Sequence, residues 1–371
     1  MQNMGRRHAA LALAAAVLSS ASPLGAGYIL FDIADRQVLE ASDADAAIAP
    51  GRAADLLLVA VLRERLTSGE VSLTDRVTVL PVAGDRGPHL STHEPVEIGE
   101  LLQLLLLSDS RTAAKTLAWA AGPSIGRALT RMQQMSGRLG LERTAIPDDW
   151  PFAAGLTTAG AAGRRGGTTA RELGRLALVI ASDLELRRRL SLDGVPISNG
   201  GLIVRTTSPL IAVESDAASR AAPDPPLRSS ARIALAERQN LALLAVTTGP
   251  RADEELTATF ERGFHRYRRV ELVREGQAVG PSVRVRGGII PSFNAIAAEP
   301  WAVTTPERSP ASFAFRLQLP GEIDAPVEVH QPLGELVVER DGHVFAVVPL
   351  IAPQAIAPRG WLDTASRSNF R

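Results

Sequence analysis

The sequence contains no cysteine and almost no lysine. Without cysteine, disulfides, a catalytic thiol and a lipid-modified N-terminal cysteine are excluded, but export from a bacterial cell is not. Lys115 is the one lysine among the 40 Lys and Arg residues. A coding bias towards arginine is the simpler explanation, but the scarcity still limits the chemistry. Lysine can lose its proton in a suitable pocket and arginine cannot, so any mechanism that needs a neutral lysine must use Lys115.

The chain also has no net charge and few aromatic residues. The formal net charge is zero, so no overall field attracts nucleic acid or an anionic membrane. Aromatic residues make up 4% of the chain, and no stacking platform for bases stands out. Two basic runs, at 187–189 and 266–269, are expected to be solvated surface.

No segment has the pattern of a metal or phosphate site. His89 and His93 are four residues apart, but prolines on both sides argue against the helix that a metal pair needs. The glycine-rich stretch 160–167 lacks the Gly-Lys-Ser/Thr of a phosphate-binding loop and is expected to be a surface loop. Asp148 and Asp149 are adjacent and are expected to belong to a turn. The sequence therefore predicts no metal and no cofactor.

The N-terminus has the pattern of an export signal. A charged start at 6–8 is followed by an apolar stretch of about ten residues, too short for the ~20 residues of a membrane-spanning helix. Small residues follow, which gives Ala21 and Ala26 as alternative cleavage sites. We therefore expect residues 1–26 to be a signal peptide and the mature protein to be exported, with the periplasm as its compartment.

Residues 27–271 have the pattern of a mixed α/β (α+β) domain. The run Leu56–Leu62 is apolar on every face, which predicts a buried helix over 51–66. Alternating and periodic apolar residues predict the other elements. The strands are expected at 28–32, 37–40, 202–213 and 231–247, and the helices at 96–107, 111–119, 122–141, 168–181 and 252–264.

The pattern changes near residue 270. Helical periodicity ends and alternation begins, with a strong hairpin signal at 335–348, where Asp341-Gly342 suits a two-residue turn. Residues 272–358 are therefore expected to form a small all-β domain. The polar tail 359–371 is expected to be disordered.

Several segments occur in the order found in one known family. They resemble the D-alanyl-D-alanine carboxypeptidases, low-molecular-weight penicillin-binding proteins of the serine peptidase type. The matching segments are Gly27–Asp32, Ala49-Pro50, Val96–Leu102 up to Ser108, Leu139–Leu141, Gly155-Leu156, Thr168–Leu173 and Arg262–Phe264. The resemblance implies a penicillin-recognising domain with helices flanking an antiparallel sheet. That family often ends in an amphipathic membrane helix, but the tail here lacks an apolar face, so membrane attachment is not expected.

The first catalytic motif of that family is missing. The family has Ser-x-x-Lys at the start of its buried helix, where residues three apart share a face and the lysine activates the serine. Arg52 stands at the serine position and Asp55 at the lysine position. Their spacing allows an ion pair in place of the nucleophile and base. No shift of register restores the motif, because residues 43–67 contain no serine and Lys115 lies far beyond them.

The second and third motifs are also altered. Ser108 fits the first position of Ser-x-Asn, but Ser110 replaces the asparagine. An ordinary loop or cap role is the favoured interpretation of Ser108. The third motif, Lys-Thr-Gly, falls near 221–223, where no lysine is present. Arg205 or Arg220 is the candidate for the missing substrate-binding cation, since arginine binds carboxylates well.

The sequence leaves two functions open. The favoured one is an inactive relative that binds a cell-wall peptide or a protein partner, with no nucleic acid. The other is a working serine-type hydrolase with relocated residues, with Ser108 as nucleophile and Lys115 nearby. Seven residues along a helix span about 10 Å, too far for direct proton transfer.

Overall fold

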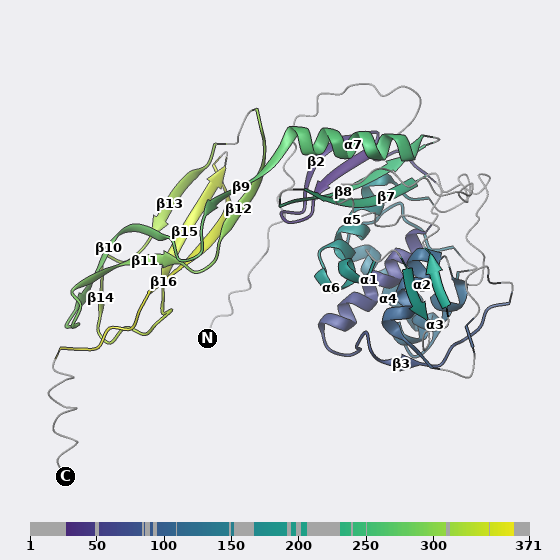
Figure 1. The fold of residues 1–371 in the computed structure, drawn as a ribbon, viewed down its shortest axis with the longest axis horizontal. Helices are drawn as coiled ribbons and strands as arrows, with labels where there is room; N and C mark the ends of the chain where they lie inside the picture. The colour runs from purple at the N-terminus through teal and green to yellow at the C-terminus, as the bar shows by residue number, and fades with distance from the viewer. Residues whose placement is uncertain are drawn as a thin grey trace, which may run out of the picture. The chain divides into compact units, whose positions relative to one another are not determined.

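The structure is a computed structural model that forms two compact units. It describes residues 27–48, 52–83, 85, 90–91, 95–108, 110–147, 150–151, 167–190, 194–197, 202–205, 231–238, 240–249, 251–308, 312–340 and 342–359. Unit 1 comprises Met1–Arg238 and Ala242–Gly263, and unit 2 comprises Gln239–Leu241 and Phe264–Arg371. Figure 1 shows the elements of both units.

A four-stranded sheet organises unit 1. Its order is β2-β1-β8-β7, and β1 pairs antiparallel with both β2 and β8. The strands are β1 (Tyr28–Asp32), β2 (Gln37–Ser42), β7 (Ala231–Arg238) and β8 (Leu241–Thr248). Both ends of the described sequence of unit 1 thus meet in one sheet.

Alternating side chains of β1 separate two layers. Ile29 and Phe31 join the large helical core, whereas Leu30 contacts the helix on the opposite face. A Cβ at Gly174 would overlap the Phe31 ring, and one at Gly263 would lie 2.8 Å from Leu30. Glycine at these two positions therefore lets helix α5 (Ala170–Ala181) and helix α7 (Ala252–Arg266) approach opposite faces of the sheet.

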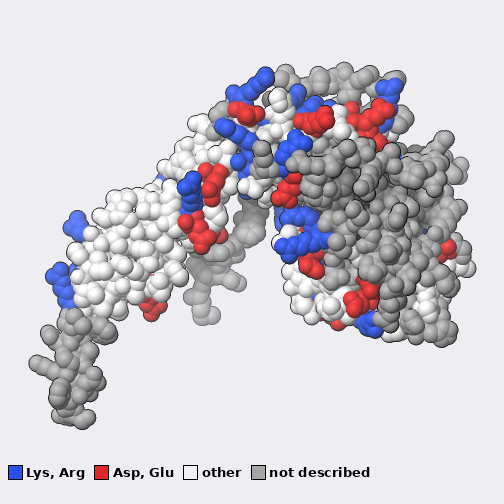
Figure 2. Space-filling model, viewed as in Figure 1, with Lys and Arg blue, Asp and Glu red and all other residues white. Residues whose placement is uncertain are grey.

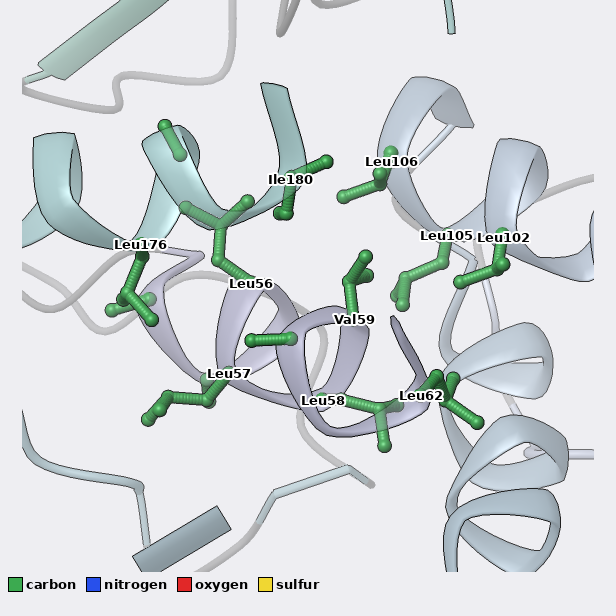
Figure 3. Close-up of a cluster of buried hydrophobic side chains, with 14 of the residues drawn as sticks. Leu56, Leu57, Leu58, Val59, Leu62, Leu102, Leu105, Leu106, Leu176 and Ile180 are labelled. Atoms are coloured by element: carbon green, nitrogen blue, oxygen red, sulfur yellow. The ribbon is translucent and has the colours of Figure 1, made fainter. Parts of the chain in front are cut away.

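Helix α1 crosses the centre of the helical layer. It spans Ala53–Thr67, and Figure 3 shows its leucines packed between Leu176 and Ile180 on one side and Leu102, Leu105 and Leu106 on the other. The surrounding helices are α2 (Ile98–Ser108), α3 (Arg111–Ala121), α4 (Ile125–Arg138), α5 (Ala170–Ala181), α6 (Leu184–Leu190) and α7 (Ala252–Arg266). The apolar run in the sequence is explained because α1 has neighbours on every side.

Two short antiparallel strand pairs complete unit 1. In one, β3 (Arg76–Val77) pairs with β4 (Val96–Glu97), and in the other β5 (Gly194–Ile197) pairs with β6 (Leu202–Arg205). The helix predicted from residue 96 was wrong at its start, because 96–97 pair with β3 and α2 begins at Ile98. Of the strand predicted at 202–213, only 202–205 lie in the described residues.

Unit 2 is built from strands. A six-stranded sheet has the order β13-β15-β16-β11-β10-β14, and β9 pairs with β12. The strands are β9 (Tyr267–Val273), β10 (Ala278–Arg286), β11 (Ser292–Ala297), β12 (Trp301–Pro306), β13 (Ala314–Gln318), β14 (Glu322–Asp324), β15 (Pro332–Arg340) and β16 (His343–Ile351). In Figure 2 the charged residues of this unit form small groups separated by wide uncharged surface.

The predicted fold class is confirmed: helices flank an antiparallel sheet, and an all-β unit follows. The hairpin predicted at 335–348 is present as β15 and β16. Among the described helices, none is long and apolar enough to cross a membrane. The predicted signal peptide at 1–26 and the tail beyond 359 lie outside the described residues.

Candidate functional site

The candidate site lies where α1, α2 and α3 meet. Arg52 is the residue before α1, and Asp55 lies in the first turn of that helix. A carboxylate is favoured there because the free N–H groups of a helix start carry partial positive charge. The ion pair expected from their spacing is present, with 3.3 Å between Arg52 Nε and Asp55 Oδ2.

Asp55 has closer partners than Arg52. Arg111, the first residue of α3, donates from Nη2 to Asp55 Oδ2 at 2.7 Å and from Nη1 to Oδ1 at 3.1 Å. Trp150 donates from its indole Nε1 to Oδ1 at 3.0 Å. Asp55, Arg111 and Trp150 are 2%, 4% and 5% exposed. We call these residues, with Arg52, the Asp55 cluster.

The surroundings of Asp55 keep its carboxyl ionised. Burial alone raises the pKa of Asp55, because a charge is disfavoured away from water. The charges of Arg111 and Arg52, with hydrogen bonds from Arg111 and Trp150, outweigh burial and hold that pKa below its ordinary value. The carboxylate is therefore a structural anion and not a proton carrier at neutral pH.

Arg52 also closes the end of a second helix. Its Nη1 donates to the Leu106 carbonyl at 2.8 Å, and its Nη2 donates to the Leu105 carbonyl. The last four carbonyls of a helix have no partner within that helix, and both acceptors belong to this group in α2. The Arg52 guanidinium thus joins the start of α1 to the end of α2, at the position expected for a nucleophile.

The hydroxyls of the two serines of the second motif form hydrogen bonds with backbone groups of α2 and α3. The Ser108 hydroxyl donates to the Leu104 carbonyl at 2.6 Å within α2, so Ser108 is the last residue of this helix, one residue beyond its predicted end. Ser110 precedes α3, where its Oγ accepts from the Ala113 N–H at 3.1 Å. It also donates to Asp85 at 3.0 Å. Ser110 is thus an N-cap residue.

Lys115 anchors a segment to α3. Its Nζ donates to the Pro81 carbonyl at 3.0 Å, and the neighbouring N–H groups of Leu80 and Val82 donate to threonine hydroxyls of the same helix. Asp85 then accepts from the first N–H groups of α3. Residues 80–83 and 85, which we call the strap, are thus docked along α3. Lys115 and Ser108 have different partners, which gives no support to a proton transfer between them.

The Asp55 cluster has donors and acceptors but no group suited to acyl transfer. Arginine and indole groups only donate, and an ionised carboxylate only accepts. A nucleophile needs a hydroxyl, thiol or amine with a base beside it. Within the Asp55 cluster no such pair is present. In the part of the chain that the structure describes, no group of three or more His, Asp or Glu residues could hold a metal.

Several predicted positions cannot be compared with the structure. Arg205 is the last residue of β6, but its side chain lies outside the described residues, as does all of Arg220. The same holds for 221–223, the position of the third motif. His89, His93, Asp148, Asp149 and the glycine-rich stretch 160–167 also lie outside the described residues.

The family-like segments that are retained support the scaffold. The Thr169 hydroxyl caps α5 by accepting from the Glu172 N–H at 3.1 Å. The buried Glu172 carboxylate accepts from the Arg143 N–H at 2.9 Å and the Thr144 hydroxyl at 2.6 Å. In α7, Arg262 lies over the Tyr28 ring at 4.9 Å. These contacts hold α5 and α7 in place within unit 1.

The sequence interpretation missed Arg111 and Trp150. One signal pointed to Arg111: an aspartate inside a helix that is apolar on every face needs a buried counter-charge. Arg111 directly follows the second motif and was the nearest arginine to it. Trp150 carried no local signal, because its partner is 95 residues away in the sequence.

The chain is similar to known proteins in sequence and in fold. Residues 267–358 match the family model "Penicillin-binding protein 5, C-terminal domain". Over 345 residues the chain is 21% identical to D-alanyl-D-alanine carboxypeptidase DacF of Bacillus subtilis (strain 168), covering 90% of this chain and 86% of the relative.

Two solved structures show the shared fold. One is a peptidoglycan synthesis regulatory factor (PBP3) from Streptococcus pneumoniae, with a TM-score of 0.68, 14% identity, and coverage of 89% of this chain and 98% of that one. The other is penicillin-binding protein 5 from Haemophilus influenzae, with a TM-score of 0.57, 18% identity, and coverage of 89% and 97%. The expected resemblance is therefore confirmed, and the fold is shared with these structures.

Proposed function

We propose that the chain is an exported, non-catalytic relative of the D-alanyl-D-alanine carboxypeptidases of the low-molecular-weight penicillin-binding type. It acts by binding a peptidoglycan stem peptide or a protein partner. One observation carries this proposal. The positions matching the family's nucleophile and base hold Arg52 and Asp55, which are bound to each other. Asp55 is also bound to Arg111, and Arg52 is also bound to carbonyls at the end of α2.

The energetics of the Asp55 cluster support a permanent loss of activity. A buried aspartate is stable only while its counter-charge and donors remain in place. Replacing Arg52 and Asp55 by serine and lysine would put an ammonium beside the buried Arg111 guanidinium, with its anion gone. Like charges at that distance disfavour each other strongly. The double reversion is thus expected to destabilise the protein and not to restore catalysis.

Covalent labelling with a fluorescent penicillin tests the proposal directly. The purified protein should show no adduct under conditions that fully label an active carboxypeptidase used as the positive control. Release of D-alanine from a dipeptide-terminated substrate should equal the background without enzyme. Labelling that disappears in Ser108→Ala would support the alternative, an active hydrolase with relocated residues.

Binding is measured separately from turnover. A stem peptide ending in D-Ala-D-Ala is titrated into the protein by calorimetry, with the L-Ala-L-Ala peptide as the matched control. Selective binding without release of D-alanine supports the peptide as ligand. If neither peptide binds, the proposal depends on a protein partner, identified by co-purification from the envelope fraction and confirmed with the purified partner.

A further inference from the structure

Strand β13 forms one edge of the six-stranded sheet of unit 2. It is the first strand in the order of that sheet, and within the described residues its outer side pairs with no strand. Its register with β15 is continuous over all five residues, Ala314–Gln318, and this segment contains no proline. A regular edge strand presents a row of N–H and C=O groups with which a further strand can pair.

The opposite edge of the sheet is protected in a way that β13 is not. Strand β14 is three residues long, and two of them are Glu322 and Asp324. Short length and charge are both devices by which natural sheets discourage further pairing. The one charged residue of β13 is Arg316, whose Nη2 lies 2.9 Å from Glu339 Oε1 on β15. The charge of Arg316 is thus balanced within its own sheet.

The β13 edge also exposes an apolar side chain on the face of the sheet that carries the core. Leu317 packs against that core, and Phe315, two residues before it, points to the same face. The register partner of Phe315 is Val338, which is completely buried, whereas Phe315 itself is 49% exposed. Phe315 therefore continues the apolar face of the sheet to its edge.

Aromatic contacts hold the start of β13 in place. The Phe313 ring lies edge-on to the Trp301 ring, with 5.5 Å between their centroids, and 5.6 Å from the Phe345 ring. Trp301 in turn packs against the core of unit 2. The strand is thus held before its first residue as well as along β15, so a further strand could pair with it at little cost in ordering.

We propose that β13 pairs antiparallel with β13 of a second copy of this chain, across a twofold axis at Phe315. The register follows from the side chains. A shift by one residue would place core-facing residues opposite outward-facing ones, and a register centred on Arg316 would put two guanidinium groups opposite each other. With the axis at Phe315, the two phenyl rings meet and Arg316 faces Ala314.

Such a contact uses the same surface on both copies, so it closes as a dimer and does not continue into a fibre. Only five residues of each copy pair, which makes the contact small and the dimer weak. The β13 edge belongs to unit 2, so a failure of this proposal would leave the proposed loss of catalysis in unit 1 untouched.

Sedimentation equilibrium of the purified full-length protein tests the pairing. We expect a monomer–dimer equilibrium with a dissociation constant on the order of 100 µM. Phe315→Lys would put two ammonium groups opposite each other and should weaken the dimer at least about tenfold. Val344→Lys is the matched control, because Val344 is 55% exposed on β16, an interior strand of the same sheet. It should dimerise like the unchanged protein.

Mixing two variants tests the register. Phe315→Lys and Phe315→Glu should each associate poorly, whereas an equimolar mixture should regain the dimer, because opposite charges then meet across the axis. Equal melting temperatures show that the comparison is between folded proteins. Hydrogen exchange of the backbone amides of 314–318 in the unchanged protein should slow as the concentration rises through the dissociation constant. This measurement needs no variant, so it applies even where a charged variant fails to fold.

The proposal is overturned if the unchanged protein stays monomeric up to about 1 mM, ten times the expected dissociation constant. It is also overturned if Phe315→Lys and Val344→Lys associate alike, since the dimer would then use another surface. A mixture of the two charged Phe315 variants that stays monomeric contradicts the register. Exchange of the β13 amides that does not change with concentration contradicts strand pairing.

Discussion

Two arginine–aspartate pairs in this chain have nearly the same geometry and very different surroundings. Arg111 and Asp55 are joined by hydrogen bonds of 2.7 and 3.1 Å, and Arg286 and Asp324 by bonds of 2.6 and 3.1 Å. The Asp55 side chain is 3% exposed, whereas that of Asp324 is 68% exposed.

The two carboxyls reach a lowered pKa by different routes. The hydrogen bond from Arg286 lowers the pKa of Asp324 with little opposition from burial. For Asp55 burial is the largest influence and acts in the opposite direction, so several donors are needed to overcome it. The buried pair therefore depends on every partner, whereas water can replace the partner of the exposed pair.

The largest expected effect comes from removing the buried anion. Asp55→Ala leaves Arg111 and Arg52 without their acceptor and should lower the free energy of unfolding by about 3–5 kcal/mol. Urea denaturation of the full chain measures it. Glu64→Ala, on the same helix but 57% exposed, is the control and should change little. A loss below about 1 kcal/mol for Asp55→Ala would remove the distinction between the two pairs.

A double substitution sharpens this result. Asp55→Leu with Arg111→Met removes both charges and fills the space with apolar atoms. Because an apolar replacement of a buried ion pair is often neutral, the double variant should recover much of the loss seen with Asp55→Ala. If it were less stable than Asp55→Ala, the cost would come from shape and not from an unpaired charge.

Arg52→Ala should have an intermediate effect. Its side chain is 18% exposed, so water can partly replace it, but the Leu105 and Leu106 carbonyls lose their donor. We expect a loss of about 1–2 kcal/mol in the same denaturation experiment. Arg138→Ala removes a guanidinium that is 52% exposed and serves as control. An unchanged melting temperature for Arg52→Ala would contradict a bridging role between α1 and α2.

The contribution of the buried pair to stability should be lost in acid and stay constant near neutral pH. The pKa of Asp55 is lowered in the folded protein, so its contribution to stability is complete above the unfolded pKa of about 3.9 and is lost as pH falls through the folded pKa. The stability difference between the unchanged protein and Asp55→Asn should therefore be constant near neutrality and shrink below about pH 4. A difference that instead shrinks on going from pH 5 to pH 7 would oppose this assignment.

The smallest effect is expected at the exposed pair. Arg286→Ala removes a hydrogen-bonded partner of Asp324, but both groups are fully hydrated, and surface pairs contribute little or nothing measurable. Thermal unfolding should be unchanged within error. A clear drop in melting temperature would mean that geometry, and not burial, decides the strength of such pairs here.

The sequence predicted those features of the site that depend on local spacing. The apolar run Leu56–Leu62 predicted a buried helix, and three-residue spacing predicted the pair of Arg52 and Asp55. Arg111 follows Asp55 by 56 residues on another helix, so only the packing of α3 against α1 brings the two together. No local pattern encodes that contact.

An ordinary structural role was expected for Ser108, but neither the partner of its hydroxyl nor the cap role of Ser110 was predicted. Ser108 matched a motif by residue type, but its hydroxyl is bound within its own helix. Ser110 matched a substrate-orienting position and instead caps α3. Both roles depend on where one helix ends and the next begins. Helix ends are set by tertiary contacts such as that of Asp85, and sequence patterns define them least well.

The bond between Lys115 and the Pro81 carbonyl gives the strap a built-in chemical reporter. Apart from the α-amino terminus, amine-directed reagents have one target in the whole polypeptide. The rate at which such a reagent modifies that ammonium can be compared with the rate in a variant whose strap is loosened. The contact of a single segment can thus be followed without an engineered label.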